Sequence, residues 1–388
     1  MNVLLLTVHR TLNYGSVLQT FACKKIFTKL GYDMVVADYS RPTDYSRSSV
    51  SNIYRYYILR KNIKNAISIP QKAQCLITSI ASFPFTKRFW NNCNTFLDTH
   101  VSLSKEISTS DELAKLSDSY SIICSGSDQI WNSDYNNGTD EVFLLSFTPD
   151  TCCRISLASS IGKEDLNEKD MALFKSFLPR FKAVSVREKR AKELLEGIGI
   201  EAKQVLDPTL WIDYAEWSKE ASERKVKEPY LLFYKLKADA FIDRVAEVIA
   251  SKHGLKIVKV CFSNVGQSHG QNVENIVLPK IEEFISLFMY ADYIVTNSFH
   301  GTCFSINFNK PFISVARERF NSRIESILEM LDLKDRIVFS ESELQGLAHN
   351  NTIIDYNHVN EILENERNNA YRWLKHALID EQLEKTSE

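Results

Sequence analysis

The stretch of sequence that decides the fold is ADYIVTNSFHGTC, residues 291–303. Its first half is short, β-branched and aromatic, which predicts a buried strand of a parallel sheet over residues 292–296. Asn297 and Ser298 then interrupt the apolar pattern and can cap a helix directly behind them. His300 is therefore expected at the carboxyl edge of an α/β sheet, where ligands bind and where helix N-termini offer N–H groups to anions.

A single histidine at a helix start more often has a structural role than a catalytic one. Here the small polar neighbours favour chemistry, because Gly301 lets a ligand approach the backbone and Thr302 adds a hydroxyl group. A metal site that pairs His300 with Cys303 is the weaker interpretation, since no CxxC motif and no second histidine lie nearby. We therefore expect no metal.

Strands and helices alternate along most of the chain, which predicts an α/β fold made of two Rossmann-like domains facing a cleft. Apolar runs predict further strands at residues 3–8, 34–37, 120–124, 183–186, 230–234, 256–262 and 312–315. The charged stretch 216–228, which ends before Pro229, is expected to link the domains. The predicted units are an N-terminal domain of residues 1–215, a C-terminal domain of residues 229–357, and a helix within residues 358–388 that packs back across the junction.

The chain has 388 residues, of which 44% are hydrophobic and 25% charged, as is ordinary for a soluble globular protein. The net charge of −2 argues against nucleic acid as a partner. Eight cysteines are scattered, and the chain enters a strand directly after Met1 without a basic segment and cleavage site. We expect free thiols in a reducing cytoplasm. No run approaches the roughly 18 apolar residues that span a bilayer.

Residues 41–100 differ in character from the rest of the chain. They contain nine Lys or Arg residues and two Asp residues, a net charge of +7, with aromatic residues interleaved. We expect a mostly helical, basic insertion in the first domain. Such a segment is either a solvated helical face or a docking surface for an anionic membrane or a diphosphate-linked acceptor. The second interpretation would place the protein at the inner face of the membrane.

Three further strand ends carry polar residues that are expected at a carboxyl edge. Gly15 lies in the loop after the first strand, although one glycine does not make a dinucleotide-binding motif. The loop after another strand contains Asp128 and Trp131, which either bind hydroxyls and a sugar ring or begin a capped helix. Arg187 follows a third strand, where it either pairs with Glu188 or presents its planar fork to a carboxylate or phosphate.

Six short motifs together resemble the polysaccharide pyruvyl transferase family. They are NYGSVLQ at residues 13–19, GSDQIWN at 126–132, SVRE at 185–188, LDPT at 206–209, NSFHGT at 297–302 and NKPF at 309–312. Each motif alone is weak, but the ordered set extends over about residues 1–335. The resemblance implies two glycosyltransferase-B-like domains, phosphoenolpyruvate as donor substrate without a cofactor, a pair of sugar hydroxyls as acceptor, and a pyruvate ketal as product. We expect the acceptor, free or lipid-linked, on the N-terminal domain and the donor on the C-terminal domain.

The resemblance also implies which residues act. His300 matches the family's histidine that is thought to act in catalysis, and Arg187 matches its arginine at the donor site. Asp128 is the second candidate base because it lies at the facing edge. Substrate contacts are expected from Asn13, Tyr14, Gly15, Gln19, Ser127, Gln129, Trp131, Asn132, Ser298, Gly301 and Thr302.

One position departs from the family pattern. Many members have an arginine two residues before the histidine, where this chain has Ser298. We expect Arg317, Arg319 or Arg323, just downstream, to supply the charge that binds the donor phosphate. Backbone N–H groups around the start of the helix are expected to meet the remaining negative charge.

Two other functions stay open at this point. A nucleotide-sugar-dependent glycosyltransferase of the same architecture would use the basic residues for a diphosphate and Asp128 as base. A non-catalytic ligand-binding member of a polysaccharide assembly system is the third interpretation, and the presence of both His300 and Arg187 argues against it. Phosphate release from phosphoenolpyruvate, compared with turnover of nucleotide sugars, would separate the three.

Overall fold

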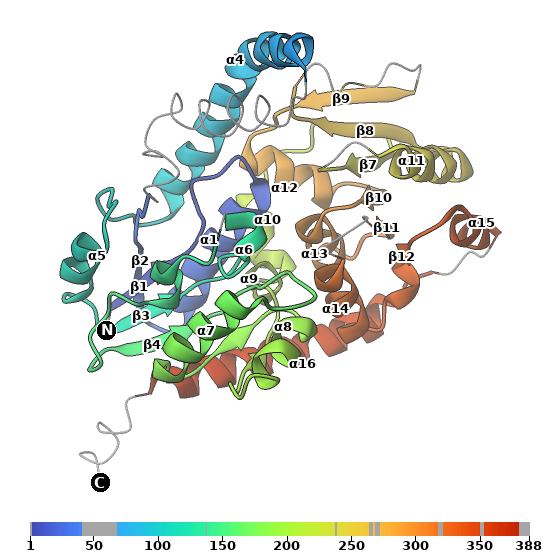
Figure 1. Cartoon of the computed structure of the whole chain (residues 1–388). Helices are drawn as coiled ribbons and strands as arrows, with labels where there is room; N and C mark the ends of the chain where they lie inside the picture. The colour runs from blue at the N-terminus through green and yellow to red at the C-terminus, as the bar shows by residue number, and fades with distance from the viewer. Residues whose placement is uncertain are drawn as a thin grey trace.

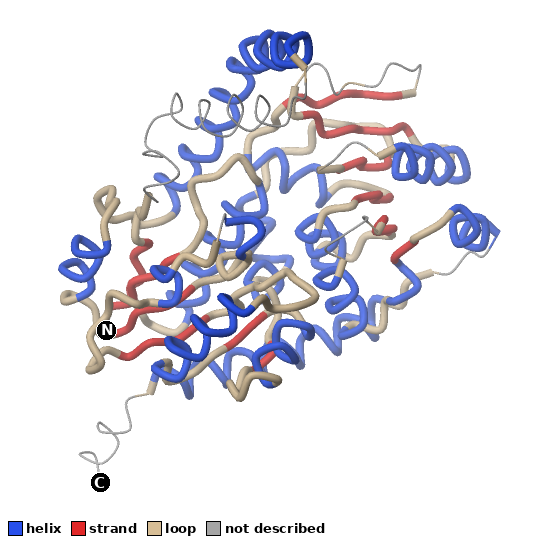
Figure 2. The backbone as a smooth tube through the Cα atoms, in the orientation of Figure 1, coloured by secondary structure: helices blue, strands red, loops and turns tan. Residues whose placement is uncertain are grey.

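Two parallel sheets lie on opposite sides of the molecule, and helices flank each of them (Figure 1). Figure 2 shows the strands of the two sheets as separate red groups with helices packed between and around them. The computed structural model describes residues 2–40, 68–136, 138–236, 239–263, 267, 272–316, 321–349 and 353–379. Within these ranges, no helix combines the length and the apolar character that crossing a bilayer requires.

The N-terminal sheet has the strand order β2-β1-β3-β4, and its neighbouring strands are parallel. Its strands are β1 (Asn2–Leu6), β2 (Asp33–Val36), β3 (Ile122–Ser125) and β4 (Cys153–Ser156). The short parallel pair β5 (Ser185–Val186) and β6 (Lys203–Gln204) continues this sheet through single bridges such as that between Ile155 and Ala183. Strand β3 is buried on both faces because helices cover both sides of the sheet, as in other parallel sheets.

The C-terminal sheet has the order β12-β11-β10-β7-β8-β9, again with parallel neighbours. Its strands are β7 (Tyr230–Tyr234), β8 (Lys256–Cys261), β9 (Val273–Val277), β10 (Tyr293–Thr296), β11 (Phe312–Val315) and β12 (Ile337–Val338). In both sheets the strands are joined by crossovers, most of which contain helices, so the carboxyl ends of each sheet share one edge.

The helices fall into two groups along the chain. The first group is α1 (Tyr14–Lys29), α4 (Ile69–His100), α5 (Ser110–Ser117), α6 (Ser133–Asn136), α7 (Glu168–Phe177), α8 (Lys189–Glu196), α9 (Pro208–Trp211) and α10 (Tyr214–Glu220), with 3₁₀ turns at Glu141–Leu144 and Leu178–Arg180. The second group is α11 (Ala240–His253), α12 (Ile281–Met289), α13 (Phe299–Asn307), α14 (Ser322–Met330), α15 (Glu341–His349) and α16 (Tyr356–Leu378), with a 3₁₀ turn at Lys334–Arg336.

The two halves are joined by one continuous apolar core. It contains buried residues of β1 and β7 and of the helices between the sheets, including α1, α12 and α13. Tyr14 crosses the junction: its ring stacks on Phe284 with centroids 4.2 Å apart, and its hydroxyl donates to the Pro279 carbonyl at 2.7 Å. Helix α16 crosses it again, because Arg367 donates to the Leu210 carbonyl of α9 and to Asn307 Oδ1 of α13.

Most of the expected strands are present, with ends shifted by a few residues. The stretch 216–228 is not only a linker, because α10 occupies its start and Trp217 is fully buried there. Among the strands of the two large sheets, three were not expected, namely β4, β9 and β12. Of the basic insertion, residues 69–100 form the long helix α4, whereas residues 41–67 lie outside the described residues.

Candidate functional site

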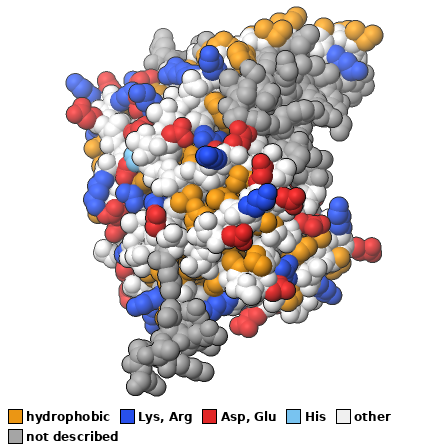
Figure 3. Space-filling model, turned by 90° about the vertical axis from the view of Figure 1, so that its left-hand side faces the viewer, with side chains coloured by type: hydrophobic (Ala, Val, Ile, Leu, Met, Phe, Trp, Pro, Cys, Tyr) orange, Lys and Arg blue, Asp and Glu red, His pale blue; other side chains and the backbone are white. Residues whose placement is uncertain are grey.

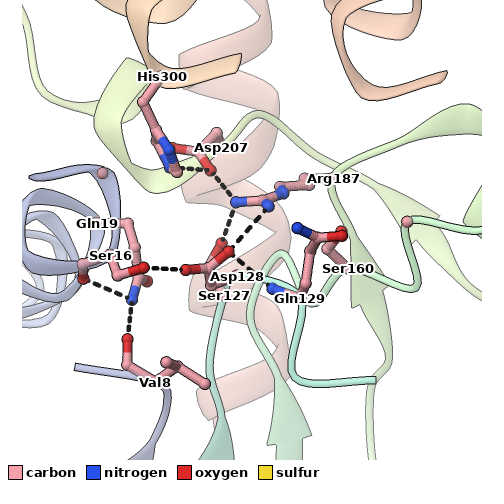
Figure 4. Close-up of polar contacts among 12 residues, drawn as sticks. Val8, Ser16, Gln19, Ser127, Asp128, Gln129, Ser160, Arg187, Asp207 and His300 are labelled. Carbon is pink, nitrogen blue, oxygen red and sulfur yellow. Dashed lines mark hydrogen bonds and ion pairs between the residues drawn. The ribbon is translucent and has the colours of Figure 1, made fainter. Parts of the chain in front are cut away.

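Side chains from both domains converge where the carboxyl edges of the two sheets face each other (Figure 4). Asp128 follows β3, Arg187 follows β5, and Asp207 follows β6, where it caps α9 by accepting a hydrogen bond from the Thr209 N–H. His300 lies in the first turn of α13, directly behind β10. The four side chains therefore follow the ends of four strands, and these ends meet where the carboxyl edges of the two sheets face each other.

Arg187 is the centre of this cluster. Its guanidinium donates to Asp207 Oδ2 at 2.7 Å and to Asp128 Oδ1 at 3.3 Å, and its side chain has no exposed surface. Burial alone would lower the pKa of Arg187, but the carboxylates of Asp207 and Asp128 raise it above the ordinary value. The arginine is therefore charged, and it holds two buried carboxylates at the junction of the domains.

Asp128 is held in a strained backbone conformation, with φ at +73°. Its Oδ2 accepts a hydrogen bond from the hydroxyl of Ser16 at 2.5 Å, and its Oδ1 accepts one from the Gln129 N–H at 2.8 Å. Burial opposes ionisation, yet Arg187 and the hydrogen bonds bring the pKa of Asp128 below its ordinary value. Asp128 is therefore an ionised carboxylate and a weak base.

His300 faces Asp207 with one ring nitrogen and Gly15 with the other. Its Nε2 lies 3.8 Å from Asp207 Oδ2 and has no hydrogen-bond partner among the described residues. A methyl group added to Gly15 would lie 2.0 Å from Nδ1, so the imidazole fills the space that a side chain would need there. Burial lowers the pKa of His300 more than the carboxylate of Asp207 raises it. The imidazole is neutral at pH 7 and can accept a proton.

Comparison with known proteins identifies the family of this chain. The model of the family "polysaccharide pyruvyl transferase" matches residues 13–319. The chain belongs to the polysaccharide pyruvyl transferase family. It is thus a transferase of polysaccharide biosynthesis, and its acceptor is a sugar or saccharide. No curated protein gives a significant match to the whole sequence.

Solved structures resemble this pyruvyl transferase in fold alone. The UDP-GlcNAc 2-epimerase from Neisseria meningitidis aligns with a TM-score of 0.53 and 12% identity over 97% of this chain and 99% of that one. The O-GlcNAc transferase of Thermobaculum terrenum aligns with a TM-score of 0.50 and 9% identity over 97% of this chain, which spans 66% of the transferase. The predicted fold, two Rossmann-like domains in a glycosyltransferase-B-like arrangement, is confirmed.

The Gly301 and Thr302 N–H groups at the start of α13 are not free to bind an anion, contrary to expectation. Ser298 caps the helix, and its hydroxyl accepts the Gly301 N–H at 3.2 Å, while its carbonyl accepts the Thr302 N–H at 2.9 Å. The Thr302 hydroxyl bonds the Ser298 carbonyl and Ser314. A methyl group on Gly301 would lie 2.4 Å from Thr296 Oγ1, so this glycine is required for packing against β10 rather than for a ligand.

The loop 126–132 forms core rather than a sugar platform, so the expected stacking by Trp131 is wrong. Trp131 is fully buried, and its indole N–H donates to the Phe143 carbonyl at 3.1 Å. Asn132 donates to Gln129 Oε1 at 2.8 Å, which leaves both amides engaged within the loop. Ser127 is also fully buried. Ser127, Trp131 and Asn132 are therefore held in the interior of the first domain, whereas Gln129 is only partly buried.

The residues expected near the start of α1 mostly hold that helix in place. Asn13 caps α1 by accepting the Gly15 N–H at 2.9 Å, and Tyr14 makes the interdomain contacts described above. Gln19 is fully buried, and its amide donates to Thr7 Oγ1 and to the Ser16 carbonyl, both at 3.0 Å. These bonds fix Gly15 against His300 and Ser16 against Asp128.

Arg323 is the one downstream arginine, of the three expected, that the described residues include, and it lies at the site. The ring of Phe299 is covered by Arg187 at 4.7 Å and by Arg323 at 5.5 Å, measured from each guanidinium carbon to the ring centroid. The charge of Arg323 also contributes to the lowered pKa of His300. Arg317 and Arg319 lie outside the described residues.

Two members of the cluster were not expected from the sequence as site residues. Asp207 lies in the motif LDPT and Ser16 in the motif NYGSVLQ, but neither side chain stood out from its local pattern. An Asp before Pro is typical of a helix start. The pattern therefore indicated a helix cap at Asp207 and not a charge partner of Arg187 and His300. Among the described residues, no group of three or more His, Cys, Asp or Glu side chains could hold a metal ion.

We predict that His300 protonates only below the ordinary histidine value of about 6.5. The unfolded chain binds that proton first, so acidification from about pH 6.5 toward the lowered pKa should reduce the free energy of unfolding. Asp207→Asn should lower the pKa of His300 further, because the carboxylate raises it. NMR titration of the ring signals, assigned with His300→Gln, measures both values. A wild-type pKa of 6.5 or above contradicts the prediction.

Proposed function

We propose that the protein transfers the pyruvyl group of phosphoenolpyruvate to two hydroxyls of a saccharide and releases inorganic phosphate. The observation that carries the proposal is the neutral imidazole of His300 beside an ionised Asp207, in a member of the pyruvyl transferase family. A neutral histidine can take a proton from a hydroxyl, and the nearby carboxylate then stabilises the imidazolium that forms.

The reaction balances without an oxidant or reductant. The bond between C2 of phosphoenolpyruvate and the phosphate oxygen breaks, and two bonds form between C2 and the saccharide oxygens. One hydroxyl proton ends on C3, which becomes a methyl group, and the other leaves with the phosphate. His300 can carry the first of these protons, because it can accept a proton from a hydroxyl and then give a proton to C3.

Arg187 acts in this proposal as a positioning residue rather than as a donor ligand. Its guanidinium is fully buried and already binds Asp207 and Asp128, so a donor carboxylate would have to displace them. Asp128 is assigned a supporting role as well, since its carboxylate is already held by Arg187, the Ser16 hydroxyl and the Gln129 N–H. Both residues fix the surroundings in which the imidazole works.

We assign the binding of the donor's negative charge to Arg323. This residue contacts the same Phe299 ring as Arg187 and lies close enough to His300 to affect its titration. It comes from the start of α14, which follows β11 at the carboxyl edge of the C-terminal sheet. In this position Arg323 takes over the role of the family arginine that Ser298 replaces.

Two substitutions should change different kinetic constants. His300→Gln should lower kcat by about 10²- to 10⁴-fold at a nearly unchanged KM for phosphoenolpyruvate, because it removes the proton transfer. Arg323→Met should raise that KM by about ten- to a hundredfold, because it removes a charged hydrogen-bond donor. The assay is phosphate release with methyl β-D-galactopyranoside, methyl β-D-glucopyranoside and methyl β-D-mannopyranoside as acceptors.

Matched controls are His358→Gln and Arg372→Met, which change exposed side chains of α16. Both should keep wild-type constants. The proposal fails if the wild type leaves phosphoenolpyruvate intact and consumes a nucleotide sugar instead.

We also propose that α4 docks the enzyme at the inner face of an anionic membrane, where a lipid-linked acceptor would lie. Ile69, Ile77 and Ile80 are 82%, 68% and 59% exposed along the first half of this helix. Figure 3 shows hydrophobic side chains gathered there, at the top of the molecule. Lys72 lies on the same half, and the positive charge of residues 41–100 would be attracted by anionic headgroups at about 1 kcal/mol per side chain.

Vesicle sedimentation tests the docking. Binding to anionic vesicles should exceed binding to neutral ones and should fall as salt shortens the Debye length from about 10 Å at 0.1 M. Ile77→Ser combined with Ile80→Ser should weaken it, whereas Phe339→Ser, at another exposed apolar side chain, should not. Equal binding to both vesicle types would leave α4 as a solvated helix.

A further inference from the structure

A hollow of 210 Å³ opens between α4 and the ends of two strands, one from each sheet. Its lining residues are Leu12, Ser82, Phe85, Thr86, Phe89 and Phe262. Leu12 comes from the loop after β1, and Phe262 directly follows β8. The hollow therefore lies at the carboxyl edges of both sheets, which is the edge that carries His300.

We infer that this hollow holds one ring of the saccharide acceptor, an inference that rests on the proposed pyruvyl transfer. Three aromatic rings line it together with Ser82 and with Thr86, whose hydroxyl donates to the Ser82 carbonyl at 3.1 Å and can still accept a hydrogen bond. Aromatic faces pack against the C–H face of a sugar ring, and hydroxyl side chains exchange hydrogen bonds with its rim. The volume is below the roughly 300–1,000 Å³ of drug-sized sites, so it accommodates a single ring and leaves the rest of the saccharide outside.

The loop after β1 connects the hollow with the residue that contacts the proton-transfer group. Leu12 of its wall and Gly15, which contacts the His300 ring, are three residues apart and so within about 11 Å of each other. Tyr14 lies between them, with its ring 4.7 Å from that of Phe89. One short loop thus forms part of the wall of the hollow and contacts the imidazole, with the buried ring of Tyr14 between the two.

Contacts at both ends keep the hollow formed. Arg10 binds both oxygens of Asp38 at 3.0 Å and also bonds Asn94, which ties α4 to the loop after β1. On the other side, Asn92 donates to the Leu278 carbonyl at 3.2 Å, which ties α4 to the C-terminal domain. The aromatic walls are therefore in place before a saccharide arrives, and ordering them adds no cost on binding.

This assignment replaces the loop 126–132 as the acceptor surface. That loop was expected to supply a stacking ring, but Trp131 is fully buried in the first domain. Phe85 is only half-buried and lines an open hollow at the junction, so its ring is the one that a sugar can reach.

Saturation-transfer NMR with the three methyl hexopyranosides named above tests the inference. We expect at least one of them to receive saturation from the wild type. Phe85→Ala should weaken its binding about five- to tenfold, by loss of an aromatic face, at an unchanged KM for phosphoenolpyruvate. Thr86→Val, which keeps the side-chain shape, should also weaken it. Thr95→Val, at an exposed position of the same helix, should bind as the wild type does.

The inference is overturned if no hexoside binds the wild type, or if Phe85→Ala and Thr86→Val, both shown to be folded by circular dichroism, bind like it. Failure of the proposed function looks different. In that case the hexoside would bind through Phe85, but no phosphate would be released from phosphoenolpyruvate.

Discussion

The ion pairs of Arg187 with Asp128 and Asp207 are the constraint on which the rest of the site depends. Two carboxylates this deeply buried would repel each other and take up protons if the guanidinium were absent. Removing one partner of a buried ion pair commonly costs about 3–5 kcal/mol, because the other charge is left uncompensated. With Arg187 in place, Asp207 stays ionised beside His300, and Asp128 stays bonded to Ser16 of α1.

This cluster also explains why the two domains meet as they do. Gly15 has no side chain because the ring of His300 occupies that space, and Tyr14 beside it is bonded to the C-terminal domain. The loop after β1 therefore leads into Tyr14, which contacts the other domain, and also lines the aromatic hollow. In the proposed mechanism, proton transfer and acceptor binding lie on either side of this loop, so a change in domain arrangement would affect both together.

Much of this could be predicted from the sequence, and the exceptions have physical causes. Strands such as Tyr230–Tyr234 and Phe312–Val315 are buried along their whole length, and their continuous apolar runs marked them correctly. The strand Val273–Val277 was missed because it lies at the edge of its sheet, is only partly buried and contains Glu274 and Asn275. The strand-end positions of His300, Arg187 and Asp128 followed from the pattern, whereas the burial of Trp131 and the pairing of Asp207 depend on tertiary contacts between distant segments.

Product analysis in D₂O tests the central claim most directly. The enzyme is incubated with phosphoenolpyruvate and each methyl hexopyranoside, and the sugar product is examined by proton and carbon NMR. The account predicts a pyruvate ketal on two hydroxyls of one sugar, with a single deuterium in its methyl group, because the proton delivered to C3 passes through an exchangeable imidazole. Recovery of intact phosphoenolpyruvate, together with glycosylation of the same sugar when a nucleotide sugar is supplied, would contradict it.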